Sequence, residues 1–302
     1  MSCRTRPVSK VLCSKIRAVF MLKIAEWILF LLSFVWQGKK KSVKSIQIIS
    51  ASLVGKFHSG NGQCNEDISS EVRVDGKSAF FVVDGAGGEV NGRLAALSVS
   101  CKLLEILKEM LPTWNDQQEM LDGLKQVLLI INQVAFEVCS RATMVLFVSL
   151  PDGTWAVLQV GDAIFLGKER SGKWTMPIHP TKYSLRGGNG RNNTNLLGAK
   201  DVNDVQPSYL SGSNAFSEFI LSSDWVCGPT ADSLIVDSQP NGIIGKYTVN
   251  QAQLKSILAR LKVGKMLAGQ FCLHHLLNEI QNGRTESAVS DDDMTLVYGV
   301  IS

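Results

Sequence analysis

Four apolar residues, 80–83, lead directly into Asp84 and a glycine-rich turn at residues 85–88. An apolar run bounded by glycines predicts a buried strand, so this pattern fixes a carboxylate at the rim of a sheet. Three further aspartates stand beside apolar segments in the same way: Asp162, Asp224 and Asp292. Mg²⁺ and Mn²⁺ prefer oxygen ligands, so strand-end carboxylates that converge in space predict a site for a hard cation.

The chain has 302 residues, of which 45% are hydrophobic, and this is enough for one large core. Its charge is unevenly distributed. Residues 1–44 contain ten Lys and Arg and one Glu, whereas the rest contains 21 Lys and Arg and 26 Asp and Glu. Because the main part of the chain is mildly acidic, we do not expect it to bind nucleic acid.

The seven cysteines include no C-x-x-C pair and are odd in number. This usage predicts reduced thiols in a cytoplasmic domain, rather than a zinc ribbon or a disulfide framework.

The sequence predicts a basic leader at residues 1–44 and one domain at residues 45–302. Within the leader, residues 18–36 are mostly apolar and are followed by three lysines at 39–41. Lys23 and Glu26 interrupt this segment, and the uninterrupted part is shorter than the ~20 residues of a membrane-spanning helix. Two interpretations stay open: a membrane anchor or interfacial helix, and a dispensable leader.

From residue 46 the pattern becomes globular, with hairpins predicted at Asp75-Gly76 and at residues 151–153. Strands are predicted at 46–56, 71–74, 79–83, 143–150, 155–160, 163–168, 218–222 and 294–300. Helices are predicted at 94–111, 121–138, 250–261 and 265–281, with Asn115 or Asp116 as the N-cap of the second. Residues 58–67 and 180–215 are predicted to be loops. Hairpin-linked strands with helices in consecutive pairs favour an α+β fold with antiparallel sheets covered by helices.

Five short motifs occur in a fixed order, each next to a predicted strand. They are Asn65-Glu66-Asp67, Asp84-Gly85-x-Gly87-Gly88, Val160-Gly161-Asp162, Ser223-Asp224 and Asp292-Asp293-Met294-Thr295. This order resembles the metal-dependent serine/threonine protein phosphatases of the type 2C class, whose motifs are N-x-D, D-G-x-G-G, G-D-S-R, S-D-G and D-N-M-T. The resemblance covers residues 46–301 and is closest to the divergent bacterial branch.

The resemblance implies a central antiparallel β-sandwich flanked by helix pairs, in four α/β/β/α layers, with two Mn²⁺ or Mg²⁺ ions at one end. By position in the motifs, Asp84 would bridge both ions and the Gly85 carbonyl would contact one, together with Glu66 or Asp67. Asp224 and Asp292 would hold the other ion. Asp162 occupies the position associated with an optional third ion.

The implied activity is hydrolysis of phosphoserine and phosphothreonine in a phosphorylated protein substrate, by a water molecule that bridges the two metals. Several residues depart from the family pattern. Gly62 stands where many members have a phosphate-binding Arg, Ala86 replaces a His, Ala163 follows Asp162 in place of the usual G-D-S-R continuation, and Trp225 replaces the Gly of S-D-G. These departures keep two alternatives open: a weakly active or inactive phosphatase-like domain that binds phosphoproteins or a partner, and a hydrolase of small phosphomonoesters.

Four nearby residues are given ordinary structural interpretations. Asp291 and Asp293 are expected to be turn or surface acids, His58 a lone loop histidine with no second histidine at metal-ligand spacing, and Arg93 an exposed cation at a helix start.

Overall fold

The predicted hairpin at residues 71–83 is present as strands β2 (Asp67–Val74) and β3 (Lys77–Gly85). Asp75 and Gly76 between them have positive φ angles of 51° and 76°, as a two-residue type I′ turn requires. The computed structural model describes residues 46–60, 64–86, 92–180, 182–183, 193–194, 196–214, 216–228, 233–238, 247–265, 270–283 and 293–301.

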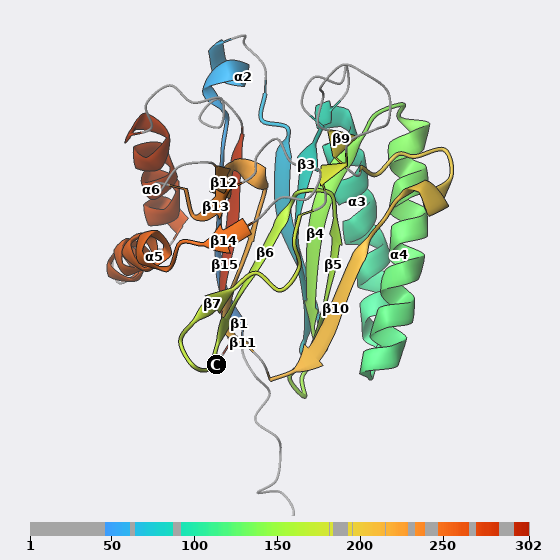
Figure 1. Ribbon diagram of the computed structural model, residues 1–302. Helices are drawn as coiled ribbons and strands as arrows, with labels where there is room; N and C mark the ends of the chain where they lie inside the picture. The colour runs from blue at the N-terminus through green and yellow to red at the C-terminus, as the bar shows by residue number, and fades with distance from the viewer. Residues whose placement is uncertain are drawn as a thin grey trace, which may run out of the picture. The chain divides into compact units, whose positions relative to one another are not determined.

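Two antiparallel sheets of five strands each form the centre of the fold (Figure 1). One sheet, which we call sheet B, has the order β10 (Ser208–Ser213), β5 (Thr154–Val160), β4 (Ala142–Ser149), β3 and β2. The other, sheet A, has the order β1 (Ile46–Leu53), β15 (Met294–Ile301), β11 (Phe216–Ser222), β6 (Ile164–Glu169) and β7 (Trp174–Thr175).

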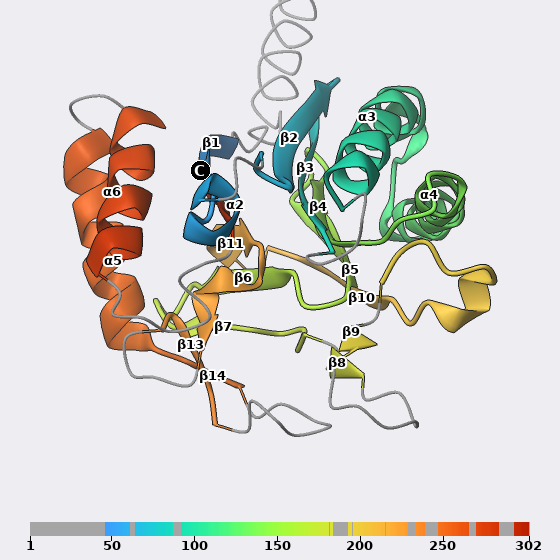
Figure 2. The same cartoon turned by 90° about the horizontal axis from the view of Figure 1, so that it is seen from above.

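Each sheet is covered on its outer face by a pair of helices, as Figure 2 shows from above. Helices α3 (Gly92–Met110) and α4 (Gln117–Glu137) pack on sheet B, and α5 (Gln251–Lys265) and α6 (Gln270–Gly283) pack on sheet A. The apolar spacing in the sequence predicted these helices because residues three and four apart share one helical face. Asp116 caps α4 by accepting a hydrogen bond from the Glu119 N–H. The predicted four-layer α/β/β/α sandwich is therefore confirmed.

Aromatic side chains fill the space between the two sheets. The ring of Phe147 on β4 lies 4.4 Å from the ring of Phe219 on β11, centroid to centroid, and 5.8 Å from that of Phe165 on β6. Phe80 and Trp155 extend the same cluster. Large stacked rings bury much apolar area with few rotatable bonds, so this layer makes a rigid support for the strand ends.

Two loop predictions need correction. Residues 180–215 include strand β10, which lies at the edge of sheet B and pairs with β5 alone. Its sequence, SYLSGS, has few apolar residues, and none of its six residues is fully buried. Residues 58–67 overlap the short helix α2 (Lys56–Gly60) and the first residue of β2.

The remaining elements are short. Strands β12 (Cys227–Gly228), β13 (Ile235–Asp237) and β14 (Tyr247–Val249) form a small sheet, and β8 (Lys182–Tyr183) pairs with β9 (Asn193–Thr194). Three 3₁₀ turns complete the order: η1 (Leu111–Thr113), η2 (Val202–Asp204) and η3 (Asp224–Val226). None of the helices in the described ranges is long and apolar enough to cross a membrane, and residues 18–36 lie outside those ranges.

Candidate metal centre

The first two predicted acidic motifs meet across the β2–β3 hairpin. Asp67, at the start of β2, lies directly opposite Asp84, near the end of β3. One step further, the Gly85 N–H donates a hydrogen bond of 3.3 Å to the Glu66 carbonyl. Strand register alone therefore brings Glu66, Asp67, Asp84 and Gly85 together at one end of sheet B.

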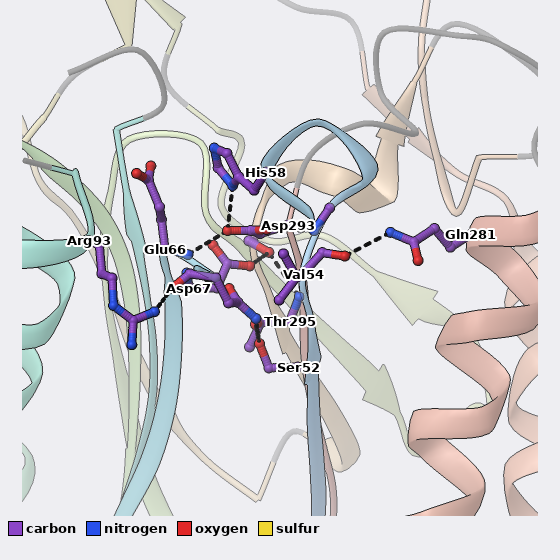
Figure 3. A network of polar contacts seen from close by, with 12 residues as sticks. Ser52, Val54, His58, Glu66, Asp67, Arg93, Gln281, Asp293 and Thr295 are labelled. Atoms are coloured by element: carbon purple, nitrogen blue, oxygen red, sulfur yellow. Dashed lines mark hydrogen bonds and ion pairs between the residues drawn. The ribbon is translucent and has the colours of Figure 1, made fainter. Parts of the chain in front are cut away.

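The start of helix α3 lies against this group. A Cβ atom at Gly92 would lie 2.7 Å from the Glu66 Oε2 atom, and a Cβ at Gly85 would overlap the Gly92 carbonyl. Side chains larger than glycine would displace one or the other, so the two glycines allow the Glu66 carboxylate, the Gly85 backbone and the first turn of α3 to approach closely. In Figure 3 the Glu66 carboxylate points away from the polar contacts that its backbone makes.

Ser223 connects the Asp224 turn to the β2 strand. Its hydroxyl donates to the Asp67 Oδ2 atom at 2.6 Å and accepts from the Thr295 N–H at 3.2 Å. Both Asp67 and Ser223 are buried, with exposed fractions of 5% and 1%. Asp224, the next residue, is thereby held on the sheet A side of the same end of the sandwich.

Trp225, which replaces the glycine of S-D-G, does not disrupt the Asp224 turn. Asp224–Val226 form the 3₁₀ turn η3, and the Trp225 side chain is 1% exposed in the core between sheet A and helices α5 and α6. Its indole N–H donates to the Thr295 carbonyl at 3.0 Å. The departure from S-D-G therefore adds a core side chain beneath the turn.

Asp162 lies in the turn between β5 and β6, after Gly161, whose φ is 81°. Its charge acts on Tyr247. Burial raises the pKa of Tyr247, and the charges of Asp237, Cys227, Asp162 and Asp224 raise that pKa further. Asp162 and Asp224 therefore both act on Tyr247, as does Asp237, which was not among the predicted ligands.

Asp293 and His58 correct two expectations. Asp293 is 2% exposed and is no surface acid, and His58 is buried in helix α2 rather than placed in a loop. The Asp293 carboxylate accepts hydrogen bonds from His58 Nδ1 at 3.0 Å and from the backbone N–H groups of Gly55 and Glu66 at 2.6 and 2.5 Å (Figure 3). These contacts could not be predicted from the sequence, because two of the three donors are backbone groups. Asp292 itself lies outside the described residues.

The described ranges cover only some of the positions near the site where this chain departs from the family pattern. Gly62, Gly87 and Gly88 lie outside the described residues. Arg93 is exposed, as expected, and its guanidinium donates to the Asn65 carbonyl. It therefore braces the loop that carries Glu66. The Ala86 N–H donates to the Arg141 carbonyl at 3.0 Å.

The donor chemistry at this end of the sandwich fits a hard divalent cation. Carboxylates of Glu66, Asp84 and Asp224 and the carbonyl of Gly85 offer only oxygen atoms, which Mg²⁺ and Mn²⁺ prefer. Within the described ranges, no three His, Cys, Asp or Glu side chains lie close enough together to hold a metal ion. The predicted ligand set includes Asp292, which those ranges omit.

Comparison with known proteins agrees with this geometry. Staphylococcus aureus Stp1, a serine/threonine phosphatase, is similar with a TM-score of 0.61 and 13% identity, covering 85% of this chain and 96% of that chain. The S. agalactiae serine/threonine phosphatase has a TM-score of 0.60 and 14% identity over 85% and 100% of the two chains. RsbX in complex with magnesium has a TM-score of 0.50 and 15% identity over 85% and 96%. Identities this low show the fold alone.

A search of curated protein sequences found no match. The family model of protein phosphatase 2C matches residues 54–247, which is more than half of the chain. These residues include four of the five acidic motifs and the strands that hold them. The chain therefore belongs to the protein phosphatase 2C family.

Proposed function

We propose that this protein hydrolyses phosphoserine and phosphothreonine in proteins with the help of two Mn²⁺ or Mg²⁺ ions. The observation that carries the proposal is the meeting of Asp67 and Asp84 across the β2–β3 register, with Ser223 joining Asp67 to the Asp224 turn. Acids from both sheets are thus brought to one end of the sandwich, as a dinuclear site needs.

The family motifs suggest which residues would hold the ions. Asp84 would be shared between two ions, the Gly85 carbonyl with Glu66 or Asp67 would complete one set, and Asp224 with Asp292 would complete the other. Asp162 would serve an optional third ion. When bound, such ions supply Lewis-acid activation of water and of the phosphoryl group.

The chain's own residues determine how these donors are presented. Asp67 already accepts a short hydrogen bond from Ser223, so one of its oxygens is engaged and its position is fixed. The Glu66 carboxylate, packed against Gly92, is directed by the start of α3. Ala86 has no side chain that can protonate a leaving group, so we expect no protein acid at that position.

The test compares two carboxylates of one hairpin. Asp84→Asn keeps the shape of the side chain and removes its charge, so we expect Mn²⁺-dependent release of phosphate from a phosphothreonine peptide to be abolished. Asp75→Asn is the matched control, because Asp75 is exposed in the turn at the other end of β3 and Asn tolerates its positive φ. A folded Asp84→Asn protein with near wild-type turnover would refute the proposal.

A phosphatase-like domain that binds phosphoproteins with little or no turnover is the second candidate. It is favoured by Ala86 and Ala163, and by the use of Arg93 in bracing the Asn65 carbonyl. Phosphate-binding side chains that act mainly in ground-state binding lower KM, so their loss raises KM more than it lowers kcat. Saturation kinetics therefore discriminate: a measurable kcat with a high KM supports the enzyme, and phosphopeptide binding without turnover supports the binding domain.

Small phosphomonoesters are a third substrate class. Comparing kcat/KM for a phosphothreonine peptide with that for p-nitrophenyl phosphate would test it. A preference for the small ester would favour a metabolite hydrolase.

We further propose a cytoplasmic location, with residues 18–36 responsible for membrane association where it occurs. A protein starting at Ser45 should fold and hydrolyse the peptide as well as the full chain, because none of the acidic motifs precedes that residue. Sedimentation with vesicles, compared between the two proteins, would show whether the leader binds lipid.

A further inference from the structure

The buried carboxylate of Asp293 connects two parts of the chain that carry predicted metal ligands. Asp293 follows Asp292 directly and precedes strand β15. Its three donors, Gly55 N–H, His58 Nδ1 and Glu66 N–H, all come from the segment between β1 and β2. The Asp293 side chain therefore holds the Glu66 backbone next to the start of β15, although the two residues are 227 positions apart in the sequence.

A second set of hydrogen bonds fixes the same segment to β1 and β15. The Asn65 side-chain amide donates to the Ser52 hydroxyl at 2.5 Å, and that hydroxyl lies 2.5 Å from the Thr295 hydroxyl. Asn65 Oδ1 also accepts from the Asp67 N–H at 2.8 Å. Glu66 is thus flanked by residues whose positions are set by β1 and β15 of sheet A, although the next strand belongs to sheet B.

His58 and Asp293 are a hydrogen-bond donor and acceptor. A carboxylate has no proton to give, so His58 Nδ1 must be the donor in their 3.0 Å contact. The family motif has asparagine where this chain has Asp293, and an asparagine offers one acceptor oxygen and a donor amide. An asparagine could not accept from all three donors found here. The three donors together therefore fit an aspartate, and an asparagine would leave one of them unpaired in this arrangement.

We propose that Asp293 and His58 are positioning residues of the proposed metal centre, which set its affinity for divalent cations by holding Glu66 in place. The inference rests on the proposed function. Residues that orient ligands from outside the coordination sphere commonly change metal affinity by roughly 10- to 100-fold when mutated. The proposal differs from a purely structural role, in which the same mutations would lower stability and leave metal affinity unchanged.

The experiment measures Mn²⁺ binding to the full-length, metal-free protein by isothermal titration calorimetry, with the melting temperature recorded in EDTA. Asp293→Asn and His58→Phe should each weaken Mn²⁺ binding by about tenfold or more. His58→Asn keeps an N–H donor near the position of Nδ1 and should recover most of the affinity.

Glu218→Gln is the matched control. Glu218 is a buried carboxylate of sheet A that accepts from Lys168 Nζ and Tyr298 Oη, both at 2.6 Å, on a strand whose other end carries the Asp224 turn. We expect this variant to lower the melting temperature and to leave Mn²⁺ affinity within twofold of wild type. If Asp293→Asn and His58→Phe behave in that same way, the proposal is refuted. Should Asp293→Asn fail to fold, the His58→Phe and His58→Asn pair decides.

The outcome separates this inference from the proposed function. A wild-type protein that binds Mn²⁺ but hydrolyses no phosphopeptide would refute the phosphatase proposal, and the variants would still decide the positioning role. A wild-type protein that binds no Mn²⁺ would overturn both.

Discussion

Restoring the family glycine at position 225 should harm this protein rather than improve it. Trp225 is 1% exposed and lies in the core between sheet A and helices α5 and α6. A tryptophan buries about 150–250 Å², and at about 25 cal/mol per Å² this corresponds to roughly 4–6 kcal/mol. Measured Trp→Ala changes in cores cost about 3–5 kcal/mol. We therefore expect Trp225→Gly to lower the free energy of unfolding by about 4 kcal/mol.

The assay is thermal unfolding followed by circular dichroism in EDTA, so that metal binding does not contribute. For a domain of this size, about 4 kcal/mol corresponds to a fall in Tm of roughly 8–16 °C. Trp225→Phe is the control: it keeps an aromatic ring and loses the N–H donor to Thr295. That carbonyl keeps the Ser222 hydroxyl at 2.9 Å and the Ser223 N–H at 3.3 Å as donors, so we expect a loss of only about 1 kcal/mol. If Trp225→Gly melts within about 2 °C of wild type, the indole does not support the Asp224 turn as argued.

Three further predictions follow from single residues. Gly92→Ala places a Cβ 2.7 Å from Glu66 Oε2 and 2.9 Å from the Ala86 carbonyl, so it should lower the affinity for Mn²⁺. Gly60→Ala is the control: its Cβ meets nothing within 4 Å, so the affinity should not change. Both amide atoms of Gln159 are buried without a hydrogen-bond partner in the described part of the chain, so Gln159→Leu should raise Tm; a lower Tm would show that the amide is bonded in solution. Burial raises the pKa of Tyr209 to about 12 from 10.0, so its contribution to stability is complete below pH 10 and is lost as the pH rises toward 12. Tyr209→Phe should therefore lose less Tm between pH 10 and pH 12 than wild type, and equal losses would contradict this reasoning.

Most of the sandwich could be predicted because its strands and helices have clear periodicity. Strand β4 is buried along its whole length, and α4 repeats apolar residues every three or four positions up to its Asp116 cap. Strand β10 could not be predicted, since an edge strand partly in solvent shows neither a long apolar run nor strict alternation.

In the candidate site, too, local patterns could be predicted and contacts between distant residues could not. The aspartates at strand ends are visible in the sequence, because a turn with glycine and a carboxylate is a local pattern. The Asp293–His58 contact is not local: its residues are 235 positions apart, and the other donors to Asp293 are backbone N–H groups that every residue has. The burial of Trp225 could not be predicted for a related reason, since its core is built from α5 and α6, which follow later in the chain, and from sheet A, whose strands come from both ends of the described chain.

The pairing of β1 with β15 has a consequence for how the protein is made. These strands match residue for residue, from Ile46 with Ile301 to Leu53 with Met294, so the first strand of the domain must wait for the last. Four of the five strands of sheet B, β2 to β5, are consecutive in the chain. The fifth, β10, is also made before β11 and β15 of sheet A. Sheet B can therefore assemble with α3 and α4 while synthesis continues. Sheet A closes only after β15 has left the ribosome. Because Asp293, whose carboxylate holds the Glu66 backbone, directly precedes β15, this contact cannot form on a nascent chain, and we expect the protein to acquire the proposed metal only after its synthesis is complete.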